Sequence, residues 1–118
     1  MQPYRIVLAD DHLMFRKGIK RNITESKELL VVGEAGDGLE AISLARELEP
    51  DVVLMDIKMP HLGGIPATRK ICANQPDTHV IILTTYDADD LVFEGIKVGA
   101  KGYLLKDTSG ERLVDAIR

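Results

Sequence analysis

The chain is poor in the features that mark secreted, membrane-spanning and nucleic-acid-binding proteins. Its 118 residues include one cysteine, Cys72, which cannot form an internal disulfide; this favours a reducing compartment, so we expect a cytoplasmic protein. Apolar runs are too short to cross a bilayer and no signal-peptide pattern opens the chain, so we expect no membrane contact. The net charge of −4 argues against nucleic-acid binding by this segment itself, because phosphate contacts need a basic surface.

The composition is that of one globular domain. Hydrophobic residues make up 45% of the chain and charged residues 29%, a balance that excludes disorder. A chain of this length suits a single domain, so we expect residues 1–118 to fold as one unit. Cys72 lies in a helical pattern beside Ile71, and we interpret it as a small buried apolar residue.

Four short apolar runs each end in reactive polar residues. Runs of this kind, rich in β-branched side chains, are typical of buried parallel strands. In an open parallel sheet, functional groups gather beyond the carboxyl ends of the strands. The runs cover residues 6–9, 52–55, 80–83 and 103–105, and they end in Asp10-Asp11, Asp56, Thr84 and Lys106.

Strand and helix patterns alternate along the whole chain. We expect strands at about 4–9, 29–35, 51–56, 79–84 and 101–105. We expect helices at about 12–26, 39–48, 65–74, from the acidic stretch 87–90 to 98, and from a cap at Thr108 or Ser109 onward. This alternation predicts a doubly wound α/β fold with a five-stranded parallel sheet in the order 2-1-3-4-5. The last helix is still in register at Arg118, so we expect a piece of a longer protein.

The predicted order places three carboxylates together, those of Asp10, Asp11 and Asp56. Clustered carboxylates resist joint ionisation unless a cation joins them, and Mg²⁺ fits because it prefers oxygen ligands and shares substrate phosphates. One carboxylate remains as a nucleophile toward phosphorus. Lys106 and Thr84 would supply the donors that phosphoryl transfer needs. Each of these residues alone has an ordinary structural interpretation, and it is their joint placement that points to chemistry.

Four segments carry a resemblance to a known family. They are "VLADDH" at 7–12, "DVVLMDIKMPHLGG" at 51–64, "IILTTY" at 81–86 and "GAKGYLLKD" at 99–107. With these segments in this order, the chain resembles the receiver domain of bacterial two-component response regulators over essentially its whole length. The resemblance implies a flavodoxin-like fold. "ADDH" and "GYLLKD" are similar to the NarL/FixJ group, whose receivers usually precede a LuxR-type helix-turn-helix domain.

The resemblance implies a role for each site residue. Asp56 would accept a phosphoryl group from a sensor histidine kinase. Asp10, Asp11, Asp56 and the backbone carbonyl of Lys58 would hold Mg²⁺, with Asp11 rather than Asp10 as the direct ligand. Such a receiver phosphorylates and slowly dephosphorylates itself once per signal, so we do not expect an enzyme in the ordinary sense.

Other residues would transmit the signal. Thr84 and Lys106 would hold the phosphoryl oxygens, and Tyr103 would be the aromatic switch residue that turns inward as Thr84 moves. A phosphorylation-dependent homodimer would follow, using either helices one and five or the face of helix four, strand five and helix five. DNA would be bound only through a further C-terminal domain. Asp107 stands where many receivers have proline, which leaves the geometry of the preceding peptide bond open.

Several alternatives stay open at this stage. The fold could serve a phosphate-independent binding module, although the complete set of site residues argues against it. A flavin carrier would need a hydroxyl-rich loop after strand one, and an aspartate-based phosphatase would need an acid at Lys58. We interpret His12 as a helix-start residue, because Mg²⁺ prefers oxygen. Lys58 and Tyr86 either shield the phosphate from water or are ordinary loop residues.

Two further patterns point to no ligand. His61 and His79 lie too far apart in the pattern to predict a zinc site. Gly33, Gly36 and Gly38 do not have the spacing of a dinucleotide-binding loop, and we interpret them as turn residues.

Overall fold

The computed structural model describes residues 3–84, 89–106 and 110–117. In these ranges the chain alternates strictly between five strands and five helices. The strands are β1 (Tyr4–Ala9), β2 (Leu29–Ala35), β3 (Val52–Asp56), β4 (His79–Thr84) and β5 (Gly102–Leu105). The helices are α1 (Leu13–Thr24), α2 (Gly38–Leu48), α3 (Gly64–Asn74), α4 (Asp89–Lys97) and α5 (Gly110–Ile117).

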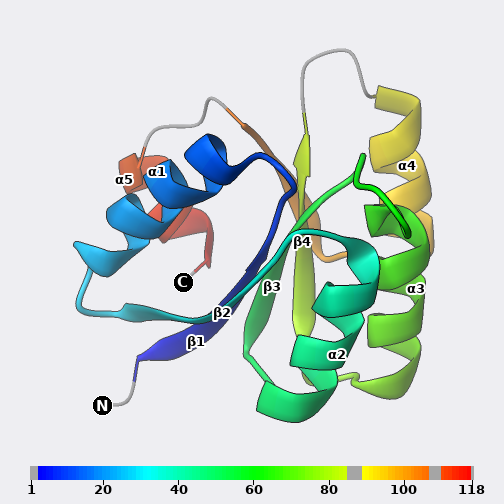
Figure 1. Cartoon of the computed structure of the whole chain (residues 1–118), viewed down its shortest axis with the longest axis horizontal. Helices are drawn as coiled ribbons and strands as arrows, with labels where there is room; N and C mark the ends of the chain where they lie inside the picture. Colours follow the sequence, from blue (N-terminus) through cyan, green and yellow to red (C-terminus); the bar gives the residue numbers. More distant parts are fainter. Residues whose placement is uncertain (1–2, 85–88, 107–109, 118) are drawn as a thin grey trace.

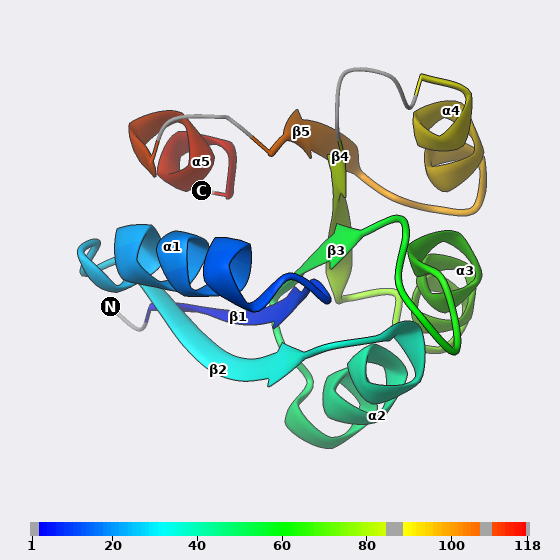
Figure 2. The same ribbon diagram turned by 45° about the horizontal axis from the view of Figure 1, so that its top comes forward.

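The strands form a parallel sheet in the order β2-β1-β3-β4-β5, which confirms the predicted fold. Helices α1 and α5 cover one face of the sheet, and α2, α3 and α4 cover the other (Figures 1 and 2). The winding reverses between β1 and β3, which pair in register from Ile6 opposite Val52 to Ala9 opposite Met55. A ligand-binding crevice is expected at such a reversal, beyond the carboxyl ends of these two strands.

The alternation of side chains along each strand divides the core between the two faces. Val7, Ala9, Val53 and Met55 belong to the cluster beneath α2, α3 and α4. Their sequence neighbours belong to the cluster beneath α1 and α5, which includes Ile6, Leu8, Val52 and Leu54. Strand β3 is buried at every residue, because it has a strand on each side and helices on both faces.

Element boundaries agree with the sequence patterns to within one or two residues. Helix α1 ends at Thr24, two residues before the predicted end. Glu25 N–H still donates to the Arg21 carbonyl, but Ser26 N–H donates to the Ile23 carbonyl, which closes the last turn more tightly. The expected caps of the last helix and the start of the acidic stretch before α4 lie outside the described residues. Among the described residues, no helix is long and apolar enough to span a bilayer.

Two glycines allow the loop after β3 to pack closely on the sheet end. A Cβ on Gly64 would overlap the Asp56 carbonyl oxygen, and a Cβ on Gly38 would overlap the Leu62 carbonyl oxygen. The same glycines donate backbone hydrogen bonds, Gly64 to the Ile57 carbonyl and Gly38 to the Leu62 carbonyl, both at 2.8 Å. The loop therefore leaves Asp56 along a path that only glycine permits.

Replacing Gly64 with alanine should destabilise the protein by about 1–3 kcal/mol, because the new methyl group must displace the backbone of Asp56. Gly18→Ala is the matched control: no atom outside the helix lies within 4 Å of its position in α1, and alanine should stabilise the helix by up to about 1 kcal/mol. Urea denaturation measures both. Equal free energies of unfolding for Gly64→Ala and the wild type would contradict the close approach.

Candidate functional site

The ends of β1 and β3 bring the predicted acids together. Ala9 lies opposite Met55 in the sheet, so the next residues, Asp10 and Asp56, lie side by side. Asp10 N–H extends the ladder by donating to the Ala35 carbonyl at 3.0 Å. Asp10 is fully buried and Asp56 is 5% exposed, whereas Asp11 faces the solvent. Two carboxylates are thus held inside the protein, and a third lies at its surface.

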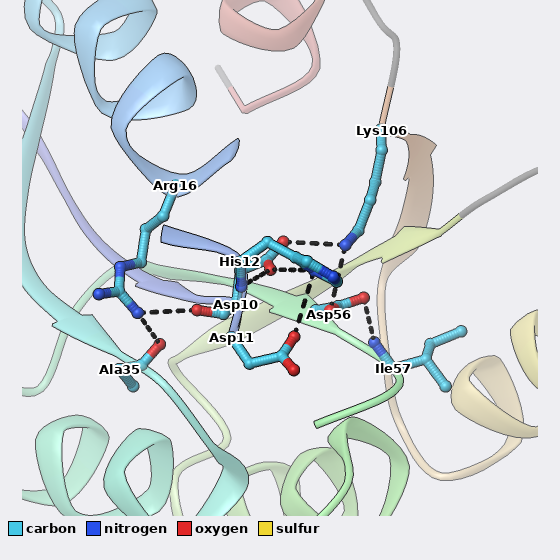
Figure 3. A network of polar contacts seen from close by, with 8 residues as sticks. All are labelled: Asp10, Asp11, His12, Arg16, Ala35, Asp56, Ile57 and Lys106. Carbon is cyan, nitrogen blue, oxygen red and sulfur yellow. Dashed lines mark hydrogen bonds and ion pairs between the residues drawn. The ribbon is translucent and has the colours of Figure 1, made fainter. Parts of the chain in front are cut away.

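Lys106 lies between the two buried carboxylates. Its Nζ is 3.0 Å from Asp10 Oδ2 and 3.1 Å from Asp56 Oδ2 (Figure 3). The ammonium also lies 4.8 Å from the centre of the Phe15 ring, close enough for a cation–π contact. Its backbone N–H donates to the Thr84 carbonyl at 2.8 Å, which fixes the end of β5 against the end of β4. Lys106, at the end of β5, therefore reaches Asp56 from two strands away and Asp10 from three, as the predicted strand order requires.

Burial and charge change the pKa values of this group. Burial raises the pKa of Asp56, and the neighbouring Asp10 carboxylate raises it further; Lys106 and the Ile57 N–H, which donates to Asp56 Oδ1 at 2.9 Å, act in the opposite direction. Burial alone would lower the pKa of Lys106, but Asp10 and Asp56 outweigh it and raise the pKa. Lys106 therefore stays an ammonium, while the ionised form of Asp56 is disfavoured.

The remaining predicted residues occupy different parts of the same edge. Thr84 ends β4 and is 3% exposed, one residue beyond Leu83, which lies opposite Asp56. Lys58 lies exposed in the loop that follows Asp56. Tyr103 lies opposite Ile82, below the site, with 55% of its surface exposed. Tyr86 and Asp107, with the peptide bond between Lys106 and Asp107, lie outside the described residues.

The loop after β3 is also fixed from its far side. His61, in a left-handed conformation with φ of 65°, places its Nδ1 2.8 Å from Asp37 Oδ2. Asp37 caps α2 by accepting from Glu40 N–H, and that hydrogen bond and His61 together hold the pKa of Asp37 below its usual value. The segment that carries the Lys58 carbonyl is thus tied to α2 as well as to α3.

Sequence reasoning missed Arg16, which supports the turn carrying the acid pair. Its Nη1 donates to the Asp10 carbonyl at 2.8 Å and to the Ala35 carbonyl at 3.2 Å (Figure 3). Its Nε pairs with Glu34 Oε1 at 3.2 Å, and Lys20 pairs with the other oxygen of Glu34 at 2.9 Å. The only available signal was its place one turn after His12, which does not distinguish it from a surface arginine.

The cluster is chemically suited to a divalent cation. Asp10, Asp11, His12 and Asp56 each offer one ligand atom, and these four atoms lie within 4.8 Å of one another. Apart from the Lys106 ammonium, Asp10 Oδ2 has no donor among the described residues. One ammonium does not balance three carboxylates, so a hard cation with oxygen preference fits the negative excess. His61 and His79 are not members of this group.

Comparison with known proteins identifies the family. Residues 6–118 match the model of the response regulator receiver domain, and the chain belongs to that family. It is 50% identical over 114 residues to the transcriptional regulatory protein YxjL of Bacillus subtilis and 44% identical over 114 residues to LiaR of the same organism. Each alignment covers 97% of this chain but only 52% of YxjL and 54% of LiaR, so the chain spans about half the length of these curated relatives.

Solved structures agree with this assignment. The signal receiver domain of NarL from Mycobacterium tuberculosis superimposes with a TM-score of 0.94 at 34% identity, covering 99% of this chain and 94% of that one. A LuxR-family two-component response regulator from Aurantimonas has a TM-score of 0.89 at 38% identity, covering 98% and 82%. The predicted family and its NarL- and LuxR-type relatives are therefore confirmed.

The raised pKa of Asp56 predicts how stability depends on pH. In metal-free buffer the ionised Asp56 is disfavoured in the folded state, so stability should fall as the pH rises from the ordinary aspartate value of 3.8 through the raised one. Asp56→Asn should therefore be more stable than the wild type at pH 7, and the difference should shrink as the pH approaches 3.8. Urea denaturation at several pH values measures this.

Asp77→Asn, at an exposed position before β4, removes the same charge outside the site and is the control. If Asp56→Asn proved less stable than the wild type at pH 7, Lys106 would have to outweigh both burial and the Asp10 charge.

Proposed function

We propose that this receiver domain accepts a phosphoryl group on Asp56 from the phosphohistidine of a sensor kinase. The observation that carries the proposal is the Lys106 ammonium, held 3.0 and 3.1 Å from Asp10 and Asp56 where β1 and β3 end. It supplies a positive charge beside a nucleophilic carboxylate that is buried and disfavoured as an anion. Esterification removes the unfavourable buried charge of the carboxylate itself, and the lysine is placed to pair with the phosphoryl group of the product.

In the proposed reaction an Asp56 carboxylate oxygen attacks phosphorus in line with the scissile bond. The oxygen–phosphorus bond forms as the phosphorus–nitrogen bond to the kinase histidine breaks, and the electron pair returns to the imidazole. Lys106 and the Thr84 hydroxyl then donate to the phosphoryl oxygens. Mg²⁺, held by Asp10, Asp11, Asp56 and the Lys58 carbonyl, would neutralise charge shared by acceptor and donor. The domain would catalyse its own labelling and slow hydrolysis, once per signal.

Phosphorylation would change the shape of one surface of the domain. As Thr84 moves toward the phosphoryl group, Tyr103 would leave its exposed position on β5 and turn inward, and the face formed by α4, β5 and α5 would change. We infer that residues 1–118 act as the regulatory unit of a longer cytoplasmic transcription regulator. YxjL and LiaR, of which this chain spans about half, are transcriptional regulatory proteins, which supports a further domain that binds DNA. A phosphorylation-dependent homodimer is part of the same proposal.

Labelling with acetyl phosphate and Mg²⁺ tests the acceptor. Intact-mass spectrometry of the wild type should detect one added phosphoryl group, and Asp56→Asn should show none, because the nucleophile is gone. Lys106→Met should label about 10²-fold more slowly, the usual cost of removing one charge-stabilising donor. Asp77→Asn should label normally, and a chelator should stop labelling of the wild type. Stoichiometric labelling of Asp56→Asn would place the acceptor elsewhere.

Beryllofluoride, which mimics the phosphoryl group, separates a switch from a phosphate-independent binding module. With Mg²⁺ it should shift the NMR signals of β4, of α4 and of the Tyr103 ring, because the proposed movement passes through Thr84. Thr84→Ala should keep the shifts near Asp56 and lose those of Tyr103. Wild-type signals that move only beside Asp56 would instead favour the binding module.

A further inference from the structure

His12 is the residue immediately before α1, and its ring turns back to the acid pair. The ring accepts no backbone hydrogen bond as a cap of its own helix, and its backbone N–H donates to Asp10 Oδ1 at 2.8 Å. Its Nδ1 lies 3.3 Å from Asp10 Oδ1 and 3.3 Å from Asp11 Oδ1 (Figure 3). The expectation that His12 marks the helix start is therefore met by its backbone, while its side chain contacts the proposed cation ligands.

The two equal distances are longer than a charge-assisted hydrogen bond, which is about 2.7–2.9 Å. The nitrogen is thus placed between two oxygens rather than bound closely to one of them. Tetrahedral ligands that lie about 2.0–2.1 Å from a zinc ion are about 3.3–3.4 Å from one another. The spacing of the nitrogen from each oxygen matches the edge of such a ligand set.

Lys106 and His12 contact different oxygens of Asp10. Lys106 contacts Oδ2 of Asp10 and Oδ2 of Asp56, whereas the ring of His12 faces Oδ1 of Asp10 and Oδ1 of Asp11. Figure 3 shows the lysine and the histidine approaching Asp10 through different oxygens. A cation bound on the histidine side therefore need not displace the ammonium.

We propose that His12 Nδ1 is a ligand, together with Asp10 and Asp11, for a late first-row divalent ion such as Zn²⁺. The inference rests on the cation site of the proposed function and adds a nitrogen donor to it. Imidazole binds zinc far more readily than magnesium, which takes oxygen ligands. The same acids would thus bind Mg²⁺ without the histidine and Zn²⁺ with it, and the two ions would compete for the pocket.

Calorimetric titration of the whole chain with ZnCl₂ and, separately, MgCl₂ tests the proposal. In His12→Asn the ratio of zinc affinity to magnesium affinity should fall about tenfold or more, because a ligand specific to zinc is lost. His79→Asn, at an exposed position outside the cluster, is the matched control and should keep the wild-type ratio. In ¹⁵N-labelled wild type, the ring nitrogen Nδ1 of His12 should shift with Zn²⁺ and stay in place with Mg²⁺.

An unchanged ratio in His12→Asn, or an unshifted His12 Nδ1 at saturating Zn²⁺, would overturn the proposal. If Mg²⁺ still binds the wild type in that case, only the nitrogen ligand is wrong. If neither ion binds the wild type, the cation site of the proposed function fails together with it.

Discussion

The chemistry of this domain depends on one lysine shared by two buried carboxylates. Asp10 and Asp56 are forced together by the pairing of β1 with β3, and without a cation between them one would be driven to bind a proton. Lys106 supplies that cation at 3.0 and 3.1 Å, and the Phe15 ring lies beside it. The lysine thus offsets part of the cost of holding two carboxylates together in a buried position.

The position of every strand was predictable because the sequence marks both the strand, by an apolar run, and its end, by a change to polar residues. The run from Val52 to Met55 predicts a strand buried on both faces, and the change to Asp56 marks where it reaches the crevice. The rule that parallel strands share a carboxyl edge then places Asp10, Asp56, Thr84 and Lys106 together. Nothing in that reasoning needs side-chain detail, which is why it could succeed from one sequence.

Contacts that depend on side-chain direction were not predictable. Helical spacing places Phe15 on the same face of α1 as Ile19 and Ile23, where it is partly buried, but it does not reveal that the ring lies beside Lys106. Arg16 follows Phe15 in the chain and would pass as a surface residue, yet its guanidinium reaches the carbonyls of Asp10 and Ala35. These contacts follow from how α1 lies across the ends of β1 and β2, and helical periodicity fixes a face but not that placement.

The central position of β3 determines where a disturbance at Asp56 can be relieved. This strand pairs with β1 and β4 and is buried along its whole length, and the loop beyond it is confined by Gly64 and by the tie between His61 and Asp37. On the β1 side, Arg16 braces the neighbouring turn. Strand β5, by contrast, has a single neighbour and is short. We therefore expect a charged group added to Asp56 to displace the β5 edge of the sheet rather than the loop after β3 or the turn that follows β1.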